Sequence, residues 1–296
     1  MRILVTGAGG LVGTHYINYS QRTHNFICPD ETEMDITNPV QVENYISETS
    51  PKCIINFAAY TDTKNAETQR NDKDGTVWKT NVGGVNNLAK ICKKKGIFLI
   101  QISTDLIFPG KSSPAEMYYE NENYSSDYKK ISWYGITKLE GETALIKSNG
   151  DSTIVRIAYP FAGPAHTKKD VLHTIFHLYN TNSLYPMFAD NTITPTYIND
   201  LSESLDKIIE GHRTGVFHVA SHKPVSHFDF AGYLLEKSGR DVSILKPGSL
   251  KEFSQKSGIP RPLYINLNTE YTENTLNVKF GTWKENIDDA LTKLSF

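Results

Sequence analysis

The chain has 296 residues, of which 39% are hydrophobic and 22% charged, a balance that suits a soluble globular protein and excludes an intrinsically disordered one. Its 31 basic and 33 acidic side chains give a formal net charge of −2, so charge gives no reason to expect nucleic acid or an anionic membrane as a partner. No apolar run approaches the roughly 20 residues that span a bilayer. Since the chain opens directly on a predicted strand, we expect no signal peptide either.

The first half alternates short apolar runs with helical stretches. The apolar runs are nearly continuous, which is typical of strands buried on both faces. Strands are predicted over residues 2–6, 25–28, 53–57, 98–103 and 152–157, and helices over residues 11–21, 39–48, 74–95 and 133–148. This alternation predicts an α/β protein with a doubly wound parallel Rossmann sheet.

The second half is less regular and predicts a smaller α/β lobe. Helices are expected over 171–179, 199–211, 227–238 and 283–294, strands over 184–188 and 215–220, and loops over 110–126, 163–169 and 246–263. The length of the 110–126 loop suggests a functional lid. We expect a dinucleotide-binding domain over residues 1–160, to which 190–220 return, and a substrate-binding lobe mainly from 161–189 and 221–296.

Three glycines, Gly7, Gly10 and Gly13, link the first strand to the first helix. Glycine lets the backbone approach a ligand closely, and the free amides at a helix N-terminus favour a phosphate. A glycine triplet alone is weak evidence for a phosphate site, but its position between a buried strand and a helix predicts a pyrophosphate site. The alternative is a merely tight turn.

Asp30 lies just beyond the second predicted strand. A carboxylate at this place usually accepts a hydrogen bond from the adenosine ribose 2′-hydroxyl, which favours NAD over NADP. The alternative is a solvated acid in the acidic loop that includes Glu31 and Glu33. Asp30 therefore leaves both NADH and NADPH open.

Tyr134 and Lys138 are four residues apart in a predicted helix, which places both on one face. An ammonium beside the phenol would lower the pKa of Tyr134 from about 10 and let it exchange a proton with an alcohol or ketone. Thr104 ends a predicted strand at the sheet edge where ligands bind. Each signal alone is common, but the three together with the glycine loop predict an oxidoreductase.

The cysteines Cys28, Cys53 and Cys92 are scattered and odd in number, which is a poor disulfide framework and gives no metal-ligand spacing. Cys28 and Cys53 lie in apolar runs, so we expect both to be buried. Reduced thiols are typical of the cytoplasm, where we expect the protein to reside.

Several segments along nearly the whole chain resemble the extended short-chain dehydrogenases/reductases, and within them the dTDP-4-dehydrorhamnose reductase family. The segments are Met34-Asp35-Ile36-Thr37-Asn38-Pro39, Asn56-Phe57-Ala58-Ala59-Tyr60-Thr61, Ala66-Glu67, Ile102-Ser103-Thr104-Asp105-Leu106-Ile107-Phe108-Pro109-Gly110, Tyr134-Gly135-Ile136-Thr137-Lys138-Leu139-Glu140-Gly141-Glu142, Thr194-Pro195-Thr196-Tyr197-Ile198-Asn199-Asp200-Leu201, Gly215-Val216-Phe217-His218-Val219-Ala220 and Arg261-Pro262.

The resemblance implies roles for individual residues. The cofactor set is Gly7, Gly10, Leu11, Val12 and Gly13 at the pyrophosphate, Asp30, Asp35 and Ile36 around the adenosine, and Ala58, Ala59 and Tyr60 beside the nicotinamide ribose, with Tyr134 and Lys138. Thr104, Tyr134 and Lys138 form the implied catalytic set. Thr104 and Asp105 would touch the sugar, and Arg261 would lie in the nucleotide-sugar pocket. Tyr159 stands where the family often has Trp, which leaves the identity of the sugar open.

The resemblance implies NADH- or NADPH-dependent reduction of the 4-keto group of a nucleotide-linked deoxyhexulose, foremost dTDP-4-dehydrorhamnose to dTDP-rhamnose. A 4,6-dehydratase would carry an Asp-Glu pair after the threonine, and Leu106 after Asp105 cannot act as acid or base. A nucleotide-sugar epimerase and a non-catalytic regulatory subunit of the methionine adenosyltransferase type stay open. A homodimer also stays open, and no residues show metal-ligand spacing.

Overall fold

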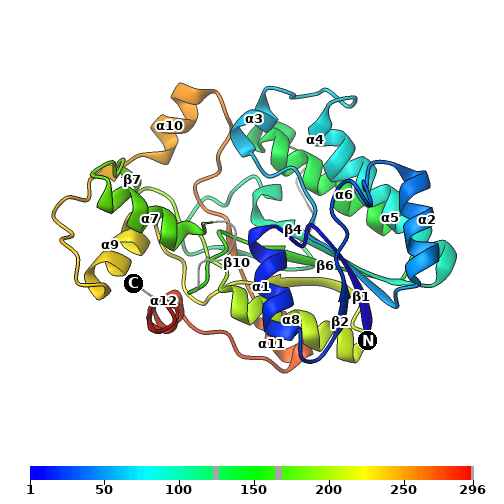
Figure 1. The fold of residues 1–296 in the computed structure, drawn as a ribbon. Coiled ribbons are helices and arrows are strands. Elements are labelled where there is room, and N and C mark those ends of the chain that lie inside the picture. Colours follow the sequence, from blue (N-terminus) through cyan, green and yellow to red (C-terminus); the bar gives the residue numbers. More distant parts are fainter. Residues whose placement is uncertain (123–126, 164–168, 295–296) are drawn as a thin grey trace.

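The computed structural model describes residues 1–122, 127–163 and 169–294, and a six-stranded parallel sheet forms its centre (Figure 1). The strands lie in the order β2-β1-β3-β4-β6-β8. Their bounds are Arg2–Thr6 for β1, Asn25–Ile27 for β2, Cys53–Asn56 for β3, Phe98–Thr104 for β4, Ser152–Ile157 for β6 and Gly215–Val219 for β8. The order reverses beside β1, so the carboxyl ends of β1 and β3 flank the crevice where such sheets bind ligands. The predicted fold class is confirmed.

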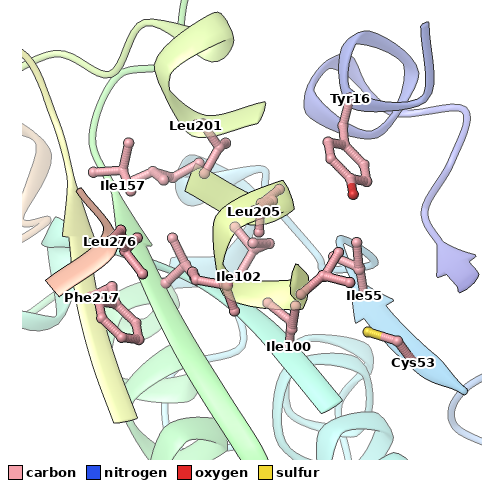
Figure 2. Packing of buried hydrophobic residues seen from close by; sticks show 14 of the residues in the cluster. Tyr16, Cys53, Ile55, Ile100, Ile102, Ile157, Leu201, Leu205, Phe217 and Leu276 are labelled. Carbon is pink, nitrogen blue, oxygen red and sulfur yellow. The ribbon is translucent and has the colours of Figure 1, made fainter. Parts of the chain in front are cut away.

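Helices cover both faces of the sheet, because each strand presents apolar side chains on both sides. On one face Tyr16 of α1 and Leu205 of α8 pack over Ile55 and Ile100 (Figure 2). On the other face Leu88 of α5 belongs to a second buried cluster. The covering helices are α1 (Leu11–Ser20), α8 (Ile198–Gly211) and α11 (Glu270–Leu276) on the first face, and α2 (Pro39–Thr49), α5 (Val85–Lys95) and α6 (Trp133–Ser148) on the second.

The helix predicted over residues 74–95 is interrupted. It consists of α4 (Thr76–Trp78), a π-helical segment (Lys79–Gly84) and α5. A π segment adds one residue to a turn, so it shifts the helix face without breaking the apolar pattern, and sequence periodicity does not reveal it. Two short elements follow strands β3 and β4, namely α3 (Thr63–Glu67) and the 3-10 turn Asp105–Ile107.

The second lobe packs around its own apolar cluster, which includes Phe161, Phe230 and Ile287. Its helices are α7 (Val171–Asn180), α9 (His227–Lys237), α10 (Leu250–Ser257) and α12 (Trp283–Thr292), and its short strands are β7 (Met187–Phe188), which pairs with β9 (Pro247–Gly248), and β10 (Asn266–Leu267), which pairs with β5 (Met117–Tyr118). The prediction of a continuous loop over 246–263 is wrong: Ser249 caps α10 by accepting from the Glu252 amide. The predicted loops 110–126 and 163–169 lie partly outside the described residues.

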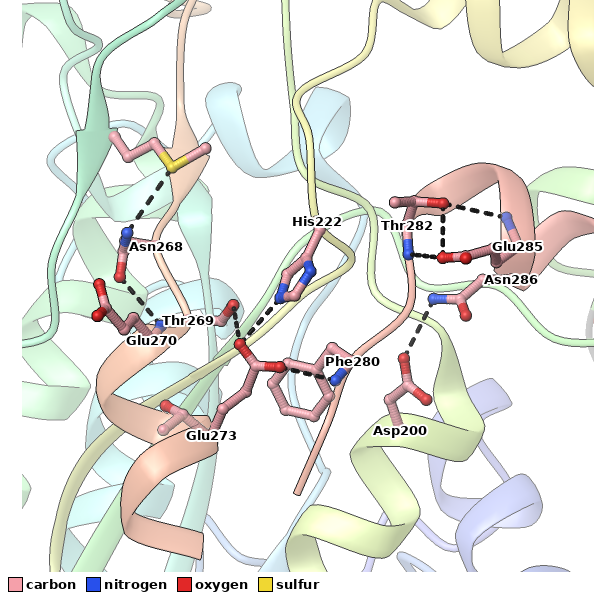
Figure 3. Close-up of polar contacts among 12 residues, drawn as sticks. Asp200, His222, Asn268, Thr269, Glu270, Glu273, Phe280, Thr282, Glu285 and Asn286 are labelled. Atoms are coloured by element: carbon pink, nitrogen blue, oxygen red, sulfur yellow. Dashed lines mark hydrogen bonds and ion pairs between the residues drawn. The ribbon is translucent and has the colours of Figure 1, made fainter. Parts of the chain in front are cut away.

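Polar contacts join the second lobe to the sheet (Figure 3). Asn286 of α12 donates to Asp200 of α8 at 3.1 Å, and Glu273 of α11 pairs with His222 at 2.9 Å. The other Glu273 oxygen accepts from the Phe280 amide at 2.9 Å. The C-terminal segment is thereby tied to the end of β8, which fixes the second lobe above the carboxyl edge of the sheet.

The three cysteines lie at different depths in the structure. Cys53 is buried as expected, but the expectation for Cys28 is wrong, since it lies just beyond the end of β2 at Ile27 and is exposed. Cys28, Cys53 and Cys92 are all free. Among the described residues, no helix has the length and apolar character needed to cross a membrane.

Candidate active site

The glycine loop packs directly against the segment that follows β3. Gly7 has φ +66°, and a Cβ there would lie 2.6 Å from the Ala58 amide nitrogen, so only glycine fits without strain. A Cβ at Gly13 would lie 2.6 Å from the Gly7 carbonyl oxygen. Leu11 and Val12 open α1, whose N-cap Gly10 offers no side-chain acceptor and whose first turn holds no acid. The backbone amides at the start of α1 therefore have no side-chain acceptor or acid in front of them, which suits the binding of a dinucleotide pyrophosphate.

The residues expected around the adenosine hold the turns after β2. Asp30 accepts from the Thr32 amide at 2.8 Å and from the Glu33 amide at 3.0 Å. Bonds from Thr32 and Glu33 lower the pKa of the exposed Asp30 carboxyl, which keeps it ionised. Asp35 accepts from the Thr37 amide and hydroxyl, each at 2.8 Å.

Ile36 is buried against Gly84 of the π segment, so only its backbone could face a ligand. Its carbonyl accepts from Asn87 at 3.0 Å. This contact ties the expected adenosine side of the site to the helix that follows the π segment.

Asn81 is a residue that the sequence analysis missed. It is 1% exposed and lies in the π segment. Its Oδ1 accepts from the Tyr60 amide at 2.9 Å, and its Nδ2 donates to Thr137 of α6 at 3.0 Å. Asn81 therefore fixes the Ala58-Ala59-Tyr60 segment relative to the helix that carries Tyr134. A π segment frequently marks a functional site, but no sequence pattern announces it.

Thr104, Asp105 and Tyr134 lie together at the carboxyl end of β4. Thr104 donates to Asp105 at 3.0 Å and accepts from the Leu106 amide at 3.2 Å. Gly135 allows α6 to touch this turn, because a Cβ there would overlap the Leu106 carbonyl oxygen. Tyr134, the residue before Gly135, thereby comes within hydrogen-bonding reach of Thr104.

Burial dominates the electrostatics of this cluster. It raises the pKa of Tyr134, the charge of Asp105 raises it further, and the bond to Thr104 opposes the rise. Burial lowers the pKa of Lys138 to about 8, and the charge of Glu142 opposes that fall. The expected lowering of the Tyr134 pKa by Lys138 is wrong for this structure, because the Lys138 amine donates to the Ile102 carbonyl at 2.7 Å and burial dominates the Tyr134 pKa.

The expected sugar-side residues come from distant segments. Tyr159 has φ 45°, and its ring meets that of His227 edge-on with centroids 4.7 Å apart. His227 shares a 3.0 Å hydrogen bond with Asn191. Arg261 lies over the ring of Phe253 in α10, with its guanidinium carbon 5.6 Å from the ring centroid.

Arg261 also reaches across to the first lobe, where its Nη2 donates to Thr63 of α3 at 3.4 Å. Its Nε is buried and has no hydrogen-bond partner in the part of the chain that the structure describes. A half-buried guanidinium whose buried Nε is an unused donor is suited to an anionic group. His227 was missed by the sequence analysis, since a histidine at the start of a helix carries no signal of its own.

Comparisons with known proteins agree with this geometry. The sequence matches the family described as the RmlD substrate binding domain over residues 1–296. The dTDP-4-dehydrorhamnose reductase of Mycobacterium tuberculosis (strain CDC 1551 / Oshkosh) is 31% identical over 271 residues, 90% of this chain and 85% of the relative. The spore coat polysaccharide biosynthesis protein SpsK of Bacillus subtilis is 28% identical over 99% of this chain and 98% of its own length.

Solved structures of dTDP-4-dehydrorhamnose reductases have the same fold as this chain. The dTDP-4-dehydrorhamnose reductase of Bacillus anthracis str. Ames, in complex with NADP, superposes with a TM-score of 0.87 at 26% identity and 98% coverage of both chains. The Clostridium acetobutylicum dTDP-4-dehydrorhamnose reductase gives 0.86 at 29% identity, with 99% of both chains covered. The chain therefore belongs to the RmlD substrate binding domain family, as the resemblance to the dTDP-4-dehydrorhamnose reductases predicts.

Proposed function

We propose that this protein uses NADPH or NADH to reduce the 4-keto group of dTDP-4-dehydrorhamnose to the alcohol of dTDP-rhamnose. The observation that carries the proposal is the meeting of Thr104, Asp105 and Tyr134 at the carboxyl end of β4, with Lys138 one helical turn beyond Tyr134. Membership of a family whose relatives are named dTDP-4-dehydrorhamnose reductases supports the choice of substrate.

In the proposed reaction the Thr104 hydroxyl turns from Asp105 to the ketone oxygen, donates its hydrogen there and so orients the ketone. Tyr134 gives its phenolic proton to the same oxygen as negative charge develops there, so the C=O becomes a CH–OH. A raised pKa keeps the Tyr134 proton in place until that moment. When bound, the reduced nicotinamide supplies the hydride that reaches the sugar C4. Burial of Tyr134 and Lys138 excludes water from the exchange.

We propose that the cofactor lies along the crevice beside β1. Gly7, Gly10, Leu11, Val12 and Gly13 would hold the pyrophosphate, Asp30, Asp35 and Ile36 the adenosine, and Ala58, Ala59, Tyr60, Tyr134 and Lys138 the nicotinamide ribose. The NADP-bound Bacillus anthracis relative supports a nicotinamide cofactor. The exposed Asp30 carboxylate would accept from a free 2′-hydroxyl and so favours NADH.

We propose that the nucleotide-linked sugar binds between the lobes. Residues 1–160 together with 190–220 would bind the dinucleotide, and 161–189 with 221–296 would supply most of the sugar side. The unpartnered Nε of Arg261 would donate a hydrogen bond to the diphosphate of the substrate. Tyr159 would form the wall against the sugar, next to Thr104 and Asp105.

The proposal is tested by mixing the protein with NADPH or NADH and dTDP-4-dehydrorhamnose while following cofactor oxidation. We expect Tyr134→Phe to lower kcat by about 10²–10⁴-fold, because it removes the proton donor. Tyr271→Phe, which removes a hydroxyl from a 52% exposed ring in α11, should leave turnover unchanged. Full activity in Tyr134→Phe would contradict the assignment. Interconversion of the sugar without cofactor consumption would instead indicate an epimerase.

A further inference from the structure

A chain of buried charges continues from the active-site lysine into the protein core. Lys138 and Glu142 are four residues apart on the buried face of α6, and they are 5% and 1% exposed. Glu142 meets Arg156 of β6 through two hydrogen bonds, Nε to Oε1 at 3.2 Å and Nη2 to Oε2 at 2.9 Å. Because both carboxyl oxygens accept from the guanidinium, Glu142 is in its ionised form.

The far side of Arg156 is also fixed. Its Nη1 lies 3.1 Å from Nε2 of His218, whose Nδ1 lies 3.1 Å from the Asn268 carbonyl oxygen. A carbonyl only accepts, so His218 donates from Nδ1 and accepts from Arg156 at Nε2, which makes the imidazole neutral. Burial, reinforced by the Arg156 charge, lowers the pKa of His218 to about 3, in agreement with that form.

Glu120 completes the row of charges. It accepts from Thr272 at 2.8 Å, and its charge opposes the fall in the pKa of Arg156 that burial causes. The buried charges around Lys138 are thus Glu142 on its own helix, Arg156 on β6 and Glu120 beyond it, with neutral His218 on β8 and Asp105 and Tyr134 on the catalytic side.

A wholly buried ion pair is costly, because desolvation of both charges offsets their attraction. The charges of Glu142 and Arg156 would cancel if no other charge were near. Lys138, however, is a third ionisable group in the same low-dielectric region. Burial raises the pKa of Glu142, and the Lys138 charge lowers it, which shows that the two groups interact. Without Glu142, the charge of Arg156 would lose its carboxylate partner, and Lys138 would lose the buried anion on its own helix face.

We propose that Glu142 is a positioning residue that, held ionised by Arg156, keeps the Lys138 ammonium charged at neutral pH. The pair acts through Lys138 and touches neither cofactor nor sugar. The inference deepens the proposed reductase function, but it can be tested through cofactor binding alone, so it fails or survives independently of sugar turnover.

The test measures the dissociation constants of NADH and NADPH between pH 7 and 9.5 for the wild type and Glu142→Gln. For the wild type, affinity should fall above pH 8, where Lys138 loses its proton. Residues four apart on a helix are neighbours, with about 5–6 Å between their Cβ atoms, and an opposite charge at such a distance shifts a pKa by about one unit. Glu142→Gln should therefore begin its fall about one pH unit lower, with binding about fivefold weaker than wild type at pH 8 and about tenfold weaker at pH 9.

Glu140→Gln is the matched control, because it makes the same change on the opposite side of the same helix, where Glu140 accepts from Tyr128. Its pH profile should match the wild type. If Glu142→Gln does not fold cooperatively in a thermal melt, the double variant Glu142→Gln/Arg156→Met removes the whole pair. Its midpoint should also be lower than that of the wild type, but by less than in the single variant, because the Arg156 charge is gone as well. An unchanged midpoint in whichever of these two variants is folded would overturn the proposal and leave the pair a structural contact.

Discussion

The cofactor side and the sugar side of the site are built in different ways. The glycine loop between β1 and α1 offers bare backbone from one short stretch of chain, with Gly7 pressed against Ala58. The proposed sugar side would be assembled from side chains that lie far apart in sequence, Tyr159 with its neighbour His227, and Arg261. Recognition of the cofactor should therefore depend on backbone conformation, and recognition of the nucleotide sugar on individual side chains.

Gly7→Ala should break the cofactor side most severely. The positive φ of Gly7 and the 2.6 Å approach of a Cβ to the Ala58 nitrogen force the loop to move. Strain of this kind costs about 1–3 kcal/mol, so the dissociation constant for NADPH should rise by about 10- to 100-fold. Gly9→Ala is the matched control, since a Cβ at Gly9 meets nothing within 4 Å. Equal losses in both variants, measured by fluorescence titration, would contradict a role for this backbone.

Arg261→Ala should damage the sugar side alone. Loss of a charge-assisted hydrogen bond to a diphosphate costs about 1.5–3 kcal/mol, so the KM for dTDP-4-dehydrorhamnose should rise by about 10- to 100-fold. The dissociation constant for NADPH should stay within about twofold of the wild type, because Arg261 touches Thr63 and Phe253 and not the glycine loop. Arg213→Ala, at an exposed arginine, is the control. If cofactor affinity fell together with KM, the proposed division between the two sides would be wrong.

Asp30→Asn should have the smallest effect on cofactor binding, and it tests whether Asp30 distinguishes NADH from NADPH. The asparagine keeps an oxygen that can accept from the Thr32 and Glu33 amides, so the turn should survive. It removes the charged acceptor for a 2′-hydroxyl, so NADH should bind about fivefold more weakly. NADPH should bind as well as before or better, because a carboxylate no longer repels its 2′-phosphate. An equal loss for both cofactors would show that Asp30 serves only the turn.

The sequence alone predicted the parts of the fold that rest on local pattern. Strands over residues 2–6 and 152–157 and the helix over residues 133–148 agree with β1, β6 and α6 to the residue, because continuous apolar runs and polar caps mark them. The π segment that carries Asn81 was missed, since its single extra residue leaves the apolar spacing intact. Helix α10 was missed because it is short and mostly polar, and its buried side is provided by Leu250.

The electrostatics of the site could not be predicted from spacing. Tyr134 and Lys138 do share a buried helix face, as four-residue spacing requires. The same spacing suggested a lowered pKa for Tyr134, and the structure shows a raised one, because the depth of burial depends on tertiary packing. The same four-residue spacing places Glu142 on the helix face of Lys138. Its partner Arg156 lies on β6, however, and only the folded chain brings these two residues together.

The central claim is that hydride passes to the C4 carbon of the sugar while Tyr134 protonates its oxygen. It is tested most directly by turnover of dTDP-4-dehydrorhamnose with NADPH or NADH that carries deuterium at the transferring position, followed by mass and NMR analysis of the sugar. The account predicts dTDP-rhamnose with one deuterium, at C4, and one cofactor oxidised for each sugar reduced. Recovery of unlabelled sugar, or of label at any other carbon, would contradict it.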